Sequence, residues 1–380
     1  MVALEIILWA LIASATYSLL VYPLLMLLLS RVAPRSFVRG KIEPRVSLLI
    51  SAFNESAAIA KKLENSLALD YPADRLEILV ASDGSTDGTD EIVAGFADRG
   101  VRLVRFEGGL GKTNVLNRAV EHTTGEILVF SDATGMYCPG ALRALIADFA
   151  DPRVGCVSGR VGYTFGDSLA SQGFGIYQRY VLALRRAEGA FGAGFNASGS
   201  IHAMRRSLFV AGPSDTFMDM VDPLHTAMRG YATTFAEEAI SMEEVRDKTK
   251  DEFRARLRIG LRAWRFLTYA IPRLPLLKRP MYCFQVSSHK FLRWLIGPSL
   301  LPIFALNLLV LGQSPLYRLL FAGQILYYGL TLTAMGARRI GSRLPGLGGL
   351  VFFNATNVAY SIALLRYLRG ERVNRWVPTR

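Results

Sequence analysis

The sequence predicts an α/β domain with a Rossmann-like, mixed and mostly parallel sheet, joined to transmembrane α-helices. Long apolar segments at both ends of the chain predict the membrane helices. Between them, short apolar runs alternate with amphipathic helical patterns, which is typical of a parallel sheet with crossover helices. Of the 380 residues, 51% are hydrophobic and 20% are charged. This composition excludes a disordered chain and argues against a fully soluble enzyme, because charged residues usually make up about a quarter of soluble domains.

The first apolar segment predicts an N-terminal transmembrane helix over residues 1–30. Residues 2–29 are almost unbroken apolar sequence and exceed the ~20 residues needed to cross a bilayer. No Lys or Arg precedes this segment, whereas a cleaved signal peptide needs a basic stretch there. The positive residues follow it: Arg31, Arg35, Arg39, Lys41 and Arg45. The positive-inside rule therefore predicts that the next domain lies in the cytoplasm.

Residues 294–367 predict about three further transmembrane helices, because three apolar runs are separated there by short polar breaks. The expected spans are residues 294–311, 317–335 and 347–365. Three full crossings would place the Arg-rich C-terminal tail outside, against the positive-inside rule. Either the rule fails here or one segment does not cross. Just before these spans, residues 262–293 mix aromatic and Leu side chains with Arg and Lys, which predicts amphipathic helices in the membrane interface.

The positive charge of the chain has a membrane explanation. Lys and Arg number 44 against 31 Asp and Glu, for a net charge of +13. The excess borders the apolar segments, where it sets topology and attracts anionic lipid. No nucleic-acid-binding motif accompanies it, so nucleic acid is not an expected partner. The three Cys residues lie far apart, which excludes a disulfide framework and a zinc knuckle.

Residues 44–261 predict the α/β domain. The expected strands cover residues 46–50, 77–81, 101–106 and 126–130, and the expected helices cover residues 56–68, 89–97 and 112–121. In parallel sheets, ligands bind at the carboxyl ends of the strands. Each of the four expected strands is followed by a polar or glycine-rich loop, and these loops cover residues 53–55, 82–87, 108–112 and 131–134. We therefore expect the chemistry at this edge of the sheet.

Two nucleotide-binding motifs are rejected. A P-loop needs a glycine five positions before its second glycine, and Phe106 stands at that position relative to Gly111. No GxGxxG string opens the first helix, so the dinucleotide fingerprint also fails. The four histidines have no metal-ligand spacing and are expected to be structural.

The order of these loops resembles the inverting family 2 glycosyltransferases, whose catalytic domain has the GT-A fold. The matching motifs are Phe53-Asn54-Glu55, Asp83-Gly84-Ser85-Thr86-Asp87, Gly111-Lys112, Ser131-Asp132-Ala133, Ser198-Gly199-Ser200 and Phe217-Met218-Asp219. The resemblance covers roughly residues 44 to 295 and points to the membrane-bound branch that makes bacterial exopolysaccharides and lipid-linked saccharides. It implies a multi-pass protein of the bacterial plasma membrane with a cytoplasmic catalytic domain.

The resemblance implies a nucleotide-diphosphate sugar donor, usually UDP-linked, with Mg²⁺ or Mn²⁺ across the diphosphate. Phe53 would stack on the base, Asp83 would accept a hydrogen bond from it, and Glu55 would support the ribose side. Lys112 would add positive charge near the diphosphate. Asp132, the first carboxylate of a DxD-type motif, would be the metal ligand.

The family resemblance assigns the general base to Asp219, the last residue of a TED-like motif. The preceding position, normally acidic, is Met218. Asp222 is the rival base because it lies three residues further on and would share a helix face with Asp219. Arg262 is a candidate contact to the diphosphate or to the acceptor.

Two departures from the family pattern bear on the product. Thr134 replaces the third DxD residue, so the metal would depend on Asp132 and diphosphate oxygens. The QxxRW motif of processive synthases is absent, and Trp264 stands one place late after Arg262. We therefore expect transfer of one or a few sugars to a lipid-linked or growing saccharide. The alternatives are a processive polysaccharide synthase that also translocates its product, and an inactive membrane scaffold or transport subunit.

Overall fold

The computed structural model describes residues 1–164, 169–244, 252–339, 344 and 346–373. The chain divides into two compact units. The sheet unit contains Leu25–Asp247 and Phe266–Gln285. The helical unit contains Met1–Leu24, Lys248–Arg265 and Val286–Arg372.

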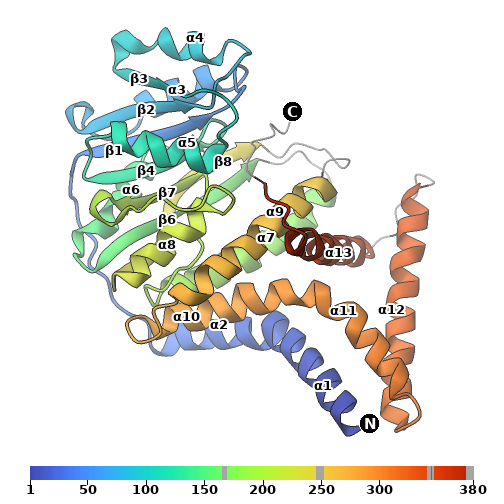
Figure 1. Cartoon of the computed structure of the whole chain (residues 1–380). Coiled ribbons are helices and arrows are strands. Elements are labelled where there is room, and N and C mark those ends of the chain that lie inside the picture. The colour runs from blue at the N-terminus through green and yellow to red at the C-terminus, as the bar shows by residue number, and fades with distance from the viewer. Residues whose placement is uncertain (165–168, 245–251, 340–343, 345, 374–380) are drawn as a thin grey trace. The chain divides into compact units, whose positions relative to one another are not determined.

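The sheet unit contains one mixed sheet, in which the described residues form eight strands (Figure 1). The strands are β1 Val46–Ala52, β2 Leu76–Ser82, β3 Val101–Arg105, β4 Ile127–Asp132, β5 Met136–Tyr137, β6 Val154–Thr164, β7 Ile201–Arg205 and β8 Ala232–Glu244. Their order is β3-β2-β1-β4-β7-β6-β8-β5. The first four strands in this order run parallel to one another, and β7 is antiparallel to both β4 and β6. The predicted mixed and mostly parallel sheet is confirmed.

Helices cover both faces of the sheet, and the side chains of β1 alternate between the two cores that result. Leu48 and Ile50 pack with Leu63 in one core, while Leu49 packs with Leu116 in the other. The helices of this unit are α3 Ile59–Leu67, α4 Thr89–Ala94, α5 Lys112–Ala119, α6 Ala141–Ala147, α7 Leu169–Gly189 and α8 Met218–Met228. Short 3₁₀ turns are η2 Ala73–Arg75, η3 Ala97–Arg99, η4 Val120–His122, η5 Asp148–Ala150, η6 Arg206–Leu208 and η7 Ile271–Arg273. Helices α3 and α6 contribute to the first core, and α5 and α8 contribute to the second.

Four helical segments among the described residues are long and apolar enough to cross a membrane. They are Val2–Val32, Pro280–Leu309, Pro315–Ala337 and Gly348–Leu368. Their elements are α1 Val2–Thr16, η1 Tyr17–Val21, α2 Tyr22–Val32, α10 Pro280–Val286, η8 Ser287–Phe291, α11 Leu292–Leu309, α12 Pro315–Arg339 and α13 Gly348–Leu368. A further helix, α9 Glu252–Ala270, comes after β8 and before α10 in the chain. The second segment begins well before the expected start at residue 294, since η8 continues α10 into α11 without a break.

Polar and small side chains join the helices within the helical unit. Tyr317 at the start of α12 donates to Glu5 on α1 over 3.0 Å, and Trp9 donates to the Tyr317 hydroxyl over 3.3 Å. Gly297 on α11 lies so close to α13 that an added Cβ would stand 2.4 Å from the Asn357 carbonyl oxygen. Close backbone approach at a small residue is a common way for membrane helices to pack.

Candidate active site

The loops after β1 and β2 form a single platform at the carboxyl edge of the sheet. The side-chain oxygen of Asn54 accepts a hydrogen bond from the Thr86 amide at 2.9 Å. The Glu55 amide donates to the Thr89 hydroxyl over the same distance. Phe53 and Glu55, two of the predicted donor-binding residues, therefore lie in a loop that is fixed by the neighbouring loop, and both are half-buried.

Asp87 holds the two loops together from the other side. Its carboxylate accepts from the Ser56 amide at 3.1 Å and from the Thr89 hydroxyl at 2.5 Å. Burial alone would raise the pKa of this carboxyl, but the hydrogen bonds from Thr89 and Ser56 lower its pKa to about 2. Asp87 therefore stays charged at neutral pH and keeps the two loops joined through these hydrogen bonds.

Asp83 fixes the glycine-rich loop. Its two carboxylate oxygens accept from the backbone amides of Leu110 and Gly111, each at 2.9 Å, and the residue is 1% exposed. The loop comes so close that a Cβ on Gly84 would lie 2.6 Å from the Gly108 nitrogen, and Gly84 also has a φ of +70°, so only glycine fits there. In the structure Asp83 supports the loop that precedes Lys112, and its hydrogen bond to a nucleotide base stays a prediction.

Replacing Asp83 with Ala is expected to loosen this loop. The buried Gly111 amide would lose its acceptor, at a cost of about 1–3 kcal/mol, and the partly buried Leu110 amide would lose its acceptor as well. We expect a lower unfolding midpoint in detergent and weaker calorimetric binding of a nucleoside diphosphate. Asp98→Ala, at an exposed position of the same domain, is the control. An Asp83→Ala protein as stable as the control would show that the carboxylate does not hold the loop.

Lys112 and Asp132 form an ion pair across the edge of the sheet. Lys112 begins α5 directly after Gly111, whose φ of +80° turns the chain into the helix. Its ammonium contacts Asp132 Oδ1 at the end of β4, and the two side chains are 26% and 29% exposed. Ser51 also donates to Asp132 Oδ1 over 3.4 Å. The pair is therefore reachable from solvent while its position is set by the strands.

Gly199 brings Asp219 into the same site. A Cβ added to Gly199 would lie 3.8 Å from Asp219 Oδ2 and 3.8 Å from Lys112 Nζ. These two atoms are therefore at most 7.6 Å apart, twice 3.8 Å. Asp219 is in the first turn of α8, where the helix dipole favours a negative charge. Gly199 therefore lies next to both the predicted base and the Lys112–Asp132 pair.

Asp222 does not share this exposed position. It is 1% exposed, and its Oδ2 atom lies 3.0 Å from His202 Nε2. Although Asp219 and Asp222 are neighbours on one helix, only Asp219 is partly exposed. The geometry favours Asp219 over its rival, and the assignment of the base stays a prediction. His202, which the sequence placed among structural residues, is buried as the partner of Asp222.

Sequence reasoning missed a buried lysine beside Asp132. Lys62 on α3 is completely buried, donates to the Gly135 carbonyl over 2.5 Å and lies 4.1 Å from the centre of the Tyr137 ring. Burial lowers its pKa to about 7, against the opposing effect of the Asp132 carboxylate. Lys62 therefore supports the turn that follows the predicted metal ligand.

Replacing Lys62 with Met is expected to change how stability depends on pH. The folded pKa of about 7 lies below the ordinary lysine value of 10.5, so the unfolded state binds the proton more tightly. The wild type should therefore gain stability relative to Lys62→Met as pH rises from 7 towards 10.5, by about 2 kcal/mol between pH 7 and 9 at ~1.4 kcal/mol per unit. Unfolding midpoints at these two pH values measure this change. Lys61→Met, exposed on the same helix, should show no such difference, and an equal response in both variants would contradict the burial of a titrating Lys62.

Glu243 is a second side chain that the sequence did not single out. The Ser200 hydroxyl donates to Glu243 at the end of β8 and lies 3.5 Å from Asp132 Oδ2. Burial raises the pKa of Glu243, the hydrogen bond from Ser200 opposes this rise, and Asp132 adds to it. A carboxylate so far along the chain from Asp132 gives no local signal, because it reaches the site only through the order of the strands.

The site fits a divalent cation that is held jointly with a substrate. The described residues contain no group of three or more His, Cys, Asp or Glu side chains arranged to hold a metal ion. Asp132 offers a partly exposed carboxylate that already contacts one cationic group, Lys112. Mg²⁺ is commonly bound by one or two carboxylates together with substrate phosphates. Asp132 therefore suits a metal ion whose other ligands come from a diphosphate.

Arg262 stays a prediction. It lies on α9 in the part of that helix that belongs to the helical unit, whereas all the residues above belong to the sheet unit.

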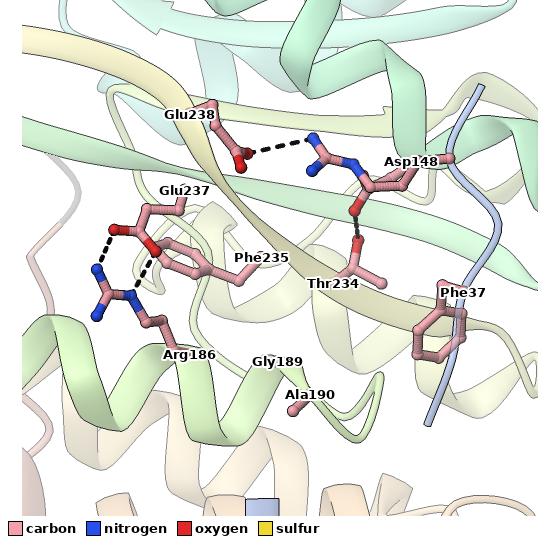
Figure 2. A pocket seen from close by; sticks show the side chains of 10 residues that line it. Phe37, Asp148, Arg186, Gly189, Ala190, Thr234, Phe235, Glu237 and Glu238 are labelled. Atoms are coloured by element: carbon pink, nitrogen blue, oxygen red, sulfur yellow. Dashed lines mark hydrogen bonds and ion pairs between the residues drawn. The ribbon is translucent and has the colours of Figure 1, made fainter. Parts of the chain in front are cut away.

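A separate cavity of about 270 Å³ lies where the segment after α2 meets β8 (Figure 2). Its charged side chains are already paired. Arg39 contacts Asp148 at 2.8 Å and Glu238 at 3.2 Å, and Arg186 pairs with Glu237. Burial raises the pKa of Asp148, and the Thr234 hydroxyl donates to its carboxylate over 2.6 Å. These contacts hold the segment after α2 against the sheet.

Residues 47–211 match the family model described as Glycosyl transferase family 2. These residues form a family 2 glycosyltransferase domain. The chain is 34% identical over 121 residues to a Beta-monoglucosyldiacylglycerol synthase from Synechocystis sp., covering 31% of this chain and 25% of that protein. It is 33% identical over 116 residues to a Poly-beta-1,6-N-acetyl-D-glucosamine synthase from Staphylococcus epidermidis, covering 30% and 28%. The matched parts thus span only about a quarter of these relatives.

The fold is similar to that of a solved glycosyltransferase over almost the whole chain. The Mannosyltransferase PcManGT from Pyrobaculum calidifontis, solved in complex with GDP-Man and Mn2+, is 24% identical and covers 97% of this chain and 100% of its own, with a TM-score of 0.70. The predicted GT-A fold with added membrane-type helices is confirmed.

Proposed function

We propose that this family 2 glycosyltransferase transfers a sugar, with inversion, from a nucleotide-diphosphate sugar to a lipid-linked or growing saccharide acceptor. The observation that carries the proposal is that Gly199 lies close to both Asp219 and Lys112, with Lys112 paired to Asp132. A single inverting displacement needs a base opposite the leaving group, and we assign that role to Asp219, which is not part of the Lys112–Asp132 ion pair.

In the proposed reaction, Asp219 accepts the proton of the attacking acceptor hydroxyl. Lys112 offsets negative charge on the departing nucleoside diphosphate, and the platform of Phe53 and Glu55 holds the nucleoside. When bound, Mg²⁺ or Mn²⁺ would neutralise further charge on the diphosphate, with Asp132 as the side chain that holds it. Gly199 keeps the path between acceptor and donor free of a side chain.

The named relatives support these substrate classes. The glucosyldiacylglycerol synthase acts at a lipid by its name, and the poly-N-acetylglucosamine synthase makes a polysaccharide by its name. PcManGT was solved with a nucleotide-diphosphate sugar and Mn2+. UDP-sugars are the first donors to test, since the family resemblance implies a UDP-linked donor, and GDP-mannose is the second.

We further propose that the protein is a multi-pass protein of the bacterial plasma membrane with its glycosyltransferase domain in the cytoplasm. The four apolar helical segments support the membrane location, and the positive residues after the first segment support the orientation. The segment between α9 and α10 supports an interfacial location, because Leu276 and Leu277 are 64% and 99% exposed beside Arg273 and Lys278.

A donor screen tests the proposal. Purified protein in detergent or lipid is given UDP- and GDP-sugars with Mn²⁺ or Mg²⁺, and release of the nucleoside diphosphate is measured with and without lipid extract. We expect release from one donor class that depends on the cation. Folded protein that binds no nucleoside diphosphate by calorimetry and releases none from any donor would favour the inactive scaffold or transport subunit.

Processive synthesis is the second candidate function. The similarity to a Poly-beta-1,6-N-acetyl-D-glucosamine synthase from Staphylococcus aureus, 28% identical over 193 residues, favours it. The missing QxxRW motif argues for one or few additions. Product length on a gel separates the two, because a polymerase yields a long ladder and a single-addition enzyme yields one product.

A further inference from the structure

A buried His–Asp pair, whose acid lies on the same helix as Asp219, takes no part in the reaction proposed above. His202 Nε2 is 3.0 Å from Asp222 Oδ2, and His202 Nδ1 is 2.8 Å from the Ser198 carbonyl oxygen. The His202 and Asp222 side chains are 2% and 1% exposed. The Phe130 ring stacks on the imidazole with a centroid distance of 4.8 Å and an interplanar angle of 22°, which fixes the plane of the ring.

The two contacts determine the number of protons on the pair. A carbonyl oxygen only accepts, so His202 Nδ1 must carry a hydrogen to bond to Ser198. The contact between Nε2 and Asp222 then needs one further proton, held by either atom. An imidazolium with a carboxylate and a neutral imidazole with a carboxylic acid both satisfy this, and both have zero net charge. Burial raises the pKa of Asp222, and the hydrogen bond from His202 opposes that rise. In either state both hydrogen bonds remain, so the pair is a fixed link.

This link connects α8, which carries Asp219, to a turn beside the Lys112–Asp132 pair. The turn at residues 198–200 contains Gly199, which faces Asp219 and Lys112, and Ser200, which lies 3.5 Å from Asp132. Asp222 lies on α8, one helical turn after Asp219. The Ala197 amide, just before this turn, also donates to the Asp219 carbonyl over 2.8 Å, so the segment is joined to α8 at both Asp219 and Asp222.

We propose that the His202–Asp222 pair is a positioning device that holds the turn at residues 198–200 against α8 and so sets the distance between Asp219 and the Lys112–Asp132 pair. This inference rests on the proposed function, because it concerns the spacing of the base from the donor-binding groups. The pair acts through its two hydrogen bonds and not through a charge. Displacement of a reacting group by about 1 Å can lower a rate by about 10²-fold, so a link of this kind affects turnover without touching the substrate.

Two substitutions of Asp222 separate hydrogen bonding from charge. In Asp222→Asn, the amide N–H donates to a neutral Nε2 and both hydrogen bonds are kept, so we expect turnover within about threefold of wild type. In Asp222→Ala, Nε2 loses its partner and a cavity opens, so we expect turnover to fall by about 10–100-fold. His202→Gln can keep one of the two bonds and should fall in between, which also serves if Asp222→Ala does not fold. Nucleoside diphosphate affinity, measured by calorimetry, should change by less than about threefold in all of them.

The matched control is Thr234→Val, which removes a buried hydrogen bond elsewhere in the same domain. It should lower the unfolding midpoint without the fall in turnover. The inference is overturned if Asp222→Asn loses activity as far as Asp219→Asn, because the carboxyl charge would then be needed. It is equally overturned if Asp222→Ala keeps wild-type turnover. A wild-type protein that releases no nucleoside diphosphate from any donor is a different result, since it removes the proposed function and this inference with it.

Discussion

Replacing Asp219 with Asn is expected to lower turnover by roughly 10²–10⁴-fold, the range for a lost general base. The amide has nearly the shape of the carboxylate but does not take the acceptor proton. The change leaves the predicted donor-binding groups in place, because Lys112 remains paired with Asp132. Donor affinity should therefore stay near the wild-type value, which calorimetry with nucleoside diphosphate and Mn²⁺ measures directly.

The comparison with matched Asp→Asn changes makes this result specific. Asp74→Asn, at an exposed position of the 3₁₀ turn η2, should keep wild-type turnover. If Asp219→Asn also kept it, the base would have to be another carboxyl, and Asp222 would be the first candidate. That outcome would require the buried His202–Asp222 pair to open during the reaction, since Asp222 is 1% exposed.

Much of the site could be predicted from sequence because its residues follow strands. Asp83 directly follows the last residue of β2, and Asp132 is the last residue of β4. Both strands are buried and parallel, and local sequence patterns identify such strands. The carboxyl ends of parallel neighbours meet at one edge, so the loops after β1, β2 and β4 had to meet there. The residue types at this edge then predict the ligand, since carboxylates, a lysine and glycines suit a phosphate ligand and a cation.

The rest of the site depends on long-range packing that no local pattern contains. Lys62 follows Lys61, and a charged pair on a short helix usually indicates a solvated face. Its burial has a weak signal, because Ile59, Lys62, Leu63 and Ser66 recur at helical spacing and are all buried on α3. The contact between His202 and Asp222 joins β7 to α8. Asp219 and Asp222 lie three residues apart on one helix, and the sequence pattern does not tell which of the two is buried.

The second large effect is expected at Asp132. In the structure its carboxylate contacts the Lys112 ammonium, the serine at residue 51 and, more distantly, Ser200. The protein offers no closed cage of three acidic, His or Cys side chains among its described residues, so a cation at this place depends on Asp132 and on the diphosphate together. Loss of this one carboxylate should therefore remove most of the cation-dependent affinity, and not a fraction of it.

Asp132→Asn is expected to lower turnover by at least about 10²-fold, because charge neutralisation by a metal ion is worth several kcal/mol in the transition state and each ~1.4 kcal/mol is a factor of ten. Chelation should stop the wild type, and added Mn²⁺ should restore the wild type but not the variant. Lys112→Met serves as the comparison, because it removes the positive partner of Asp132 and leaves the carboxylate. It should weaken nucleoside diphosphate binding while keeping the response to Mn²⁺. An Asp132→Asn protein that still responds to Mn²⁺ like the wild type would place the cation on other side chains, such as Glu243, which is linked to Asp132 through Ser200.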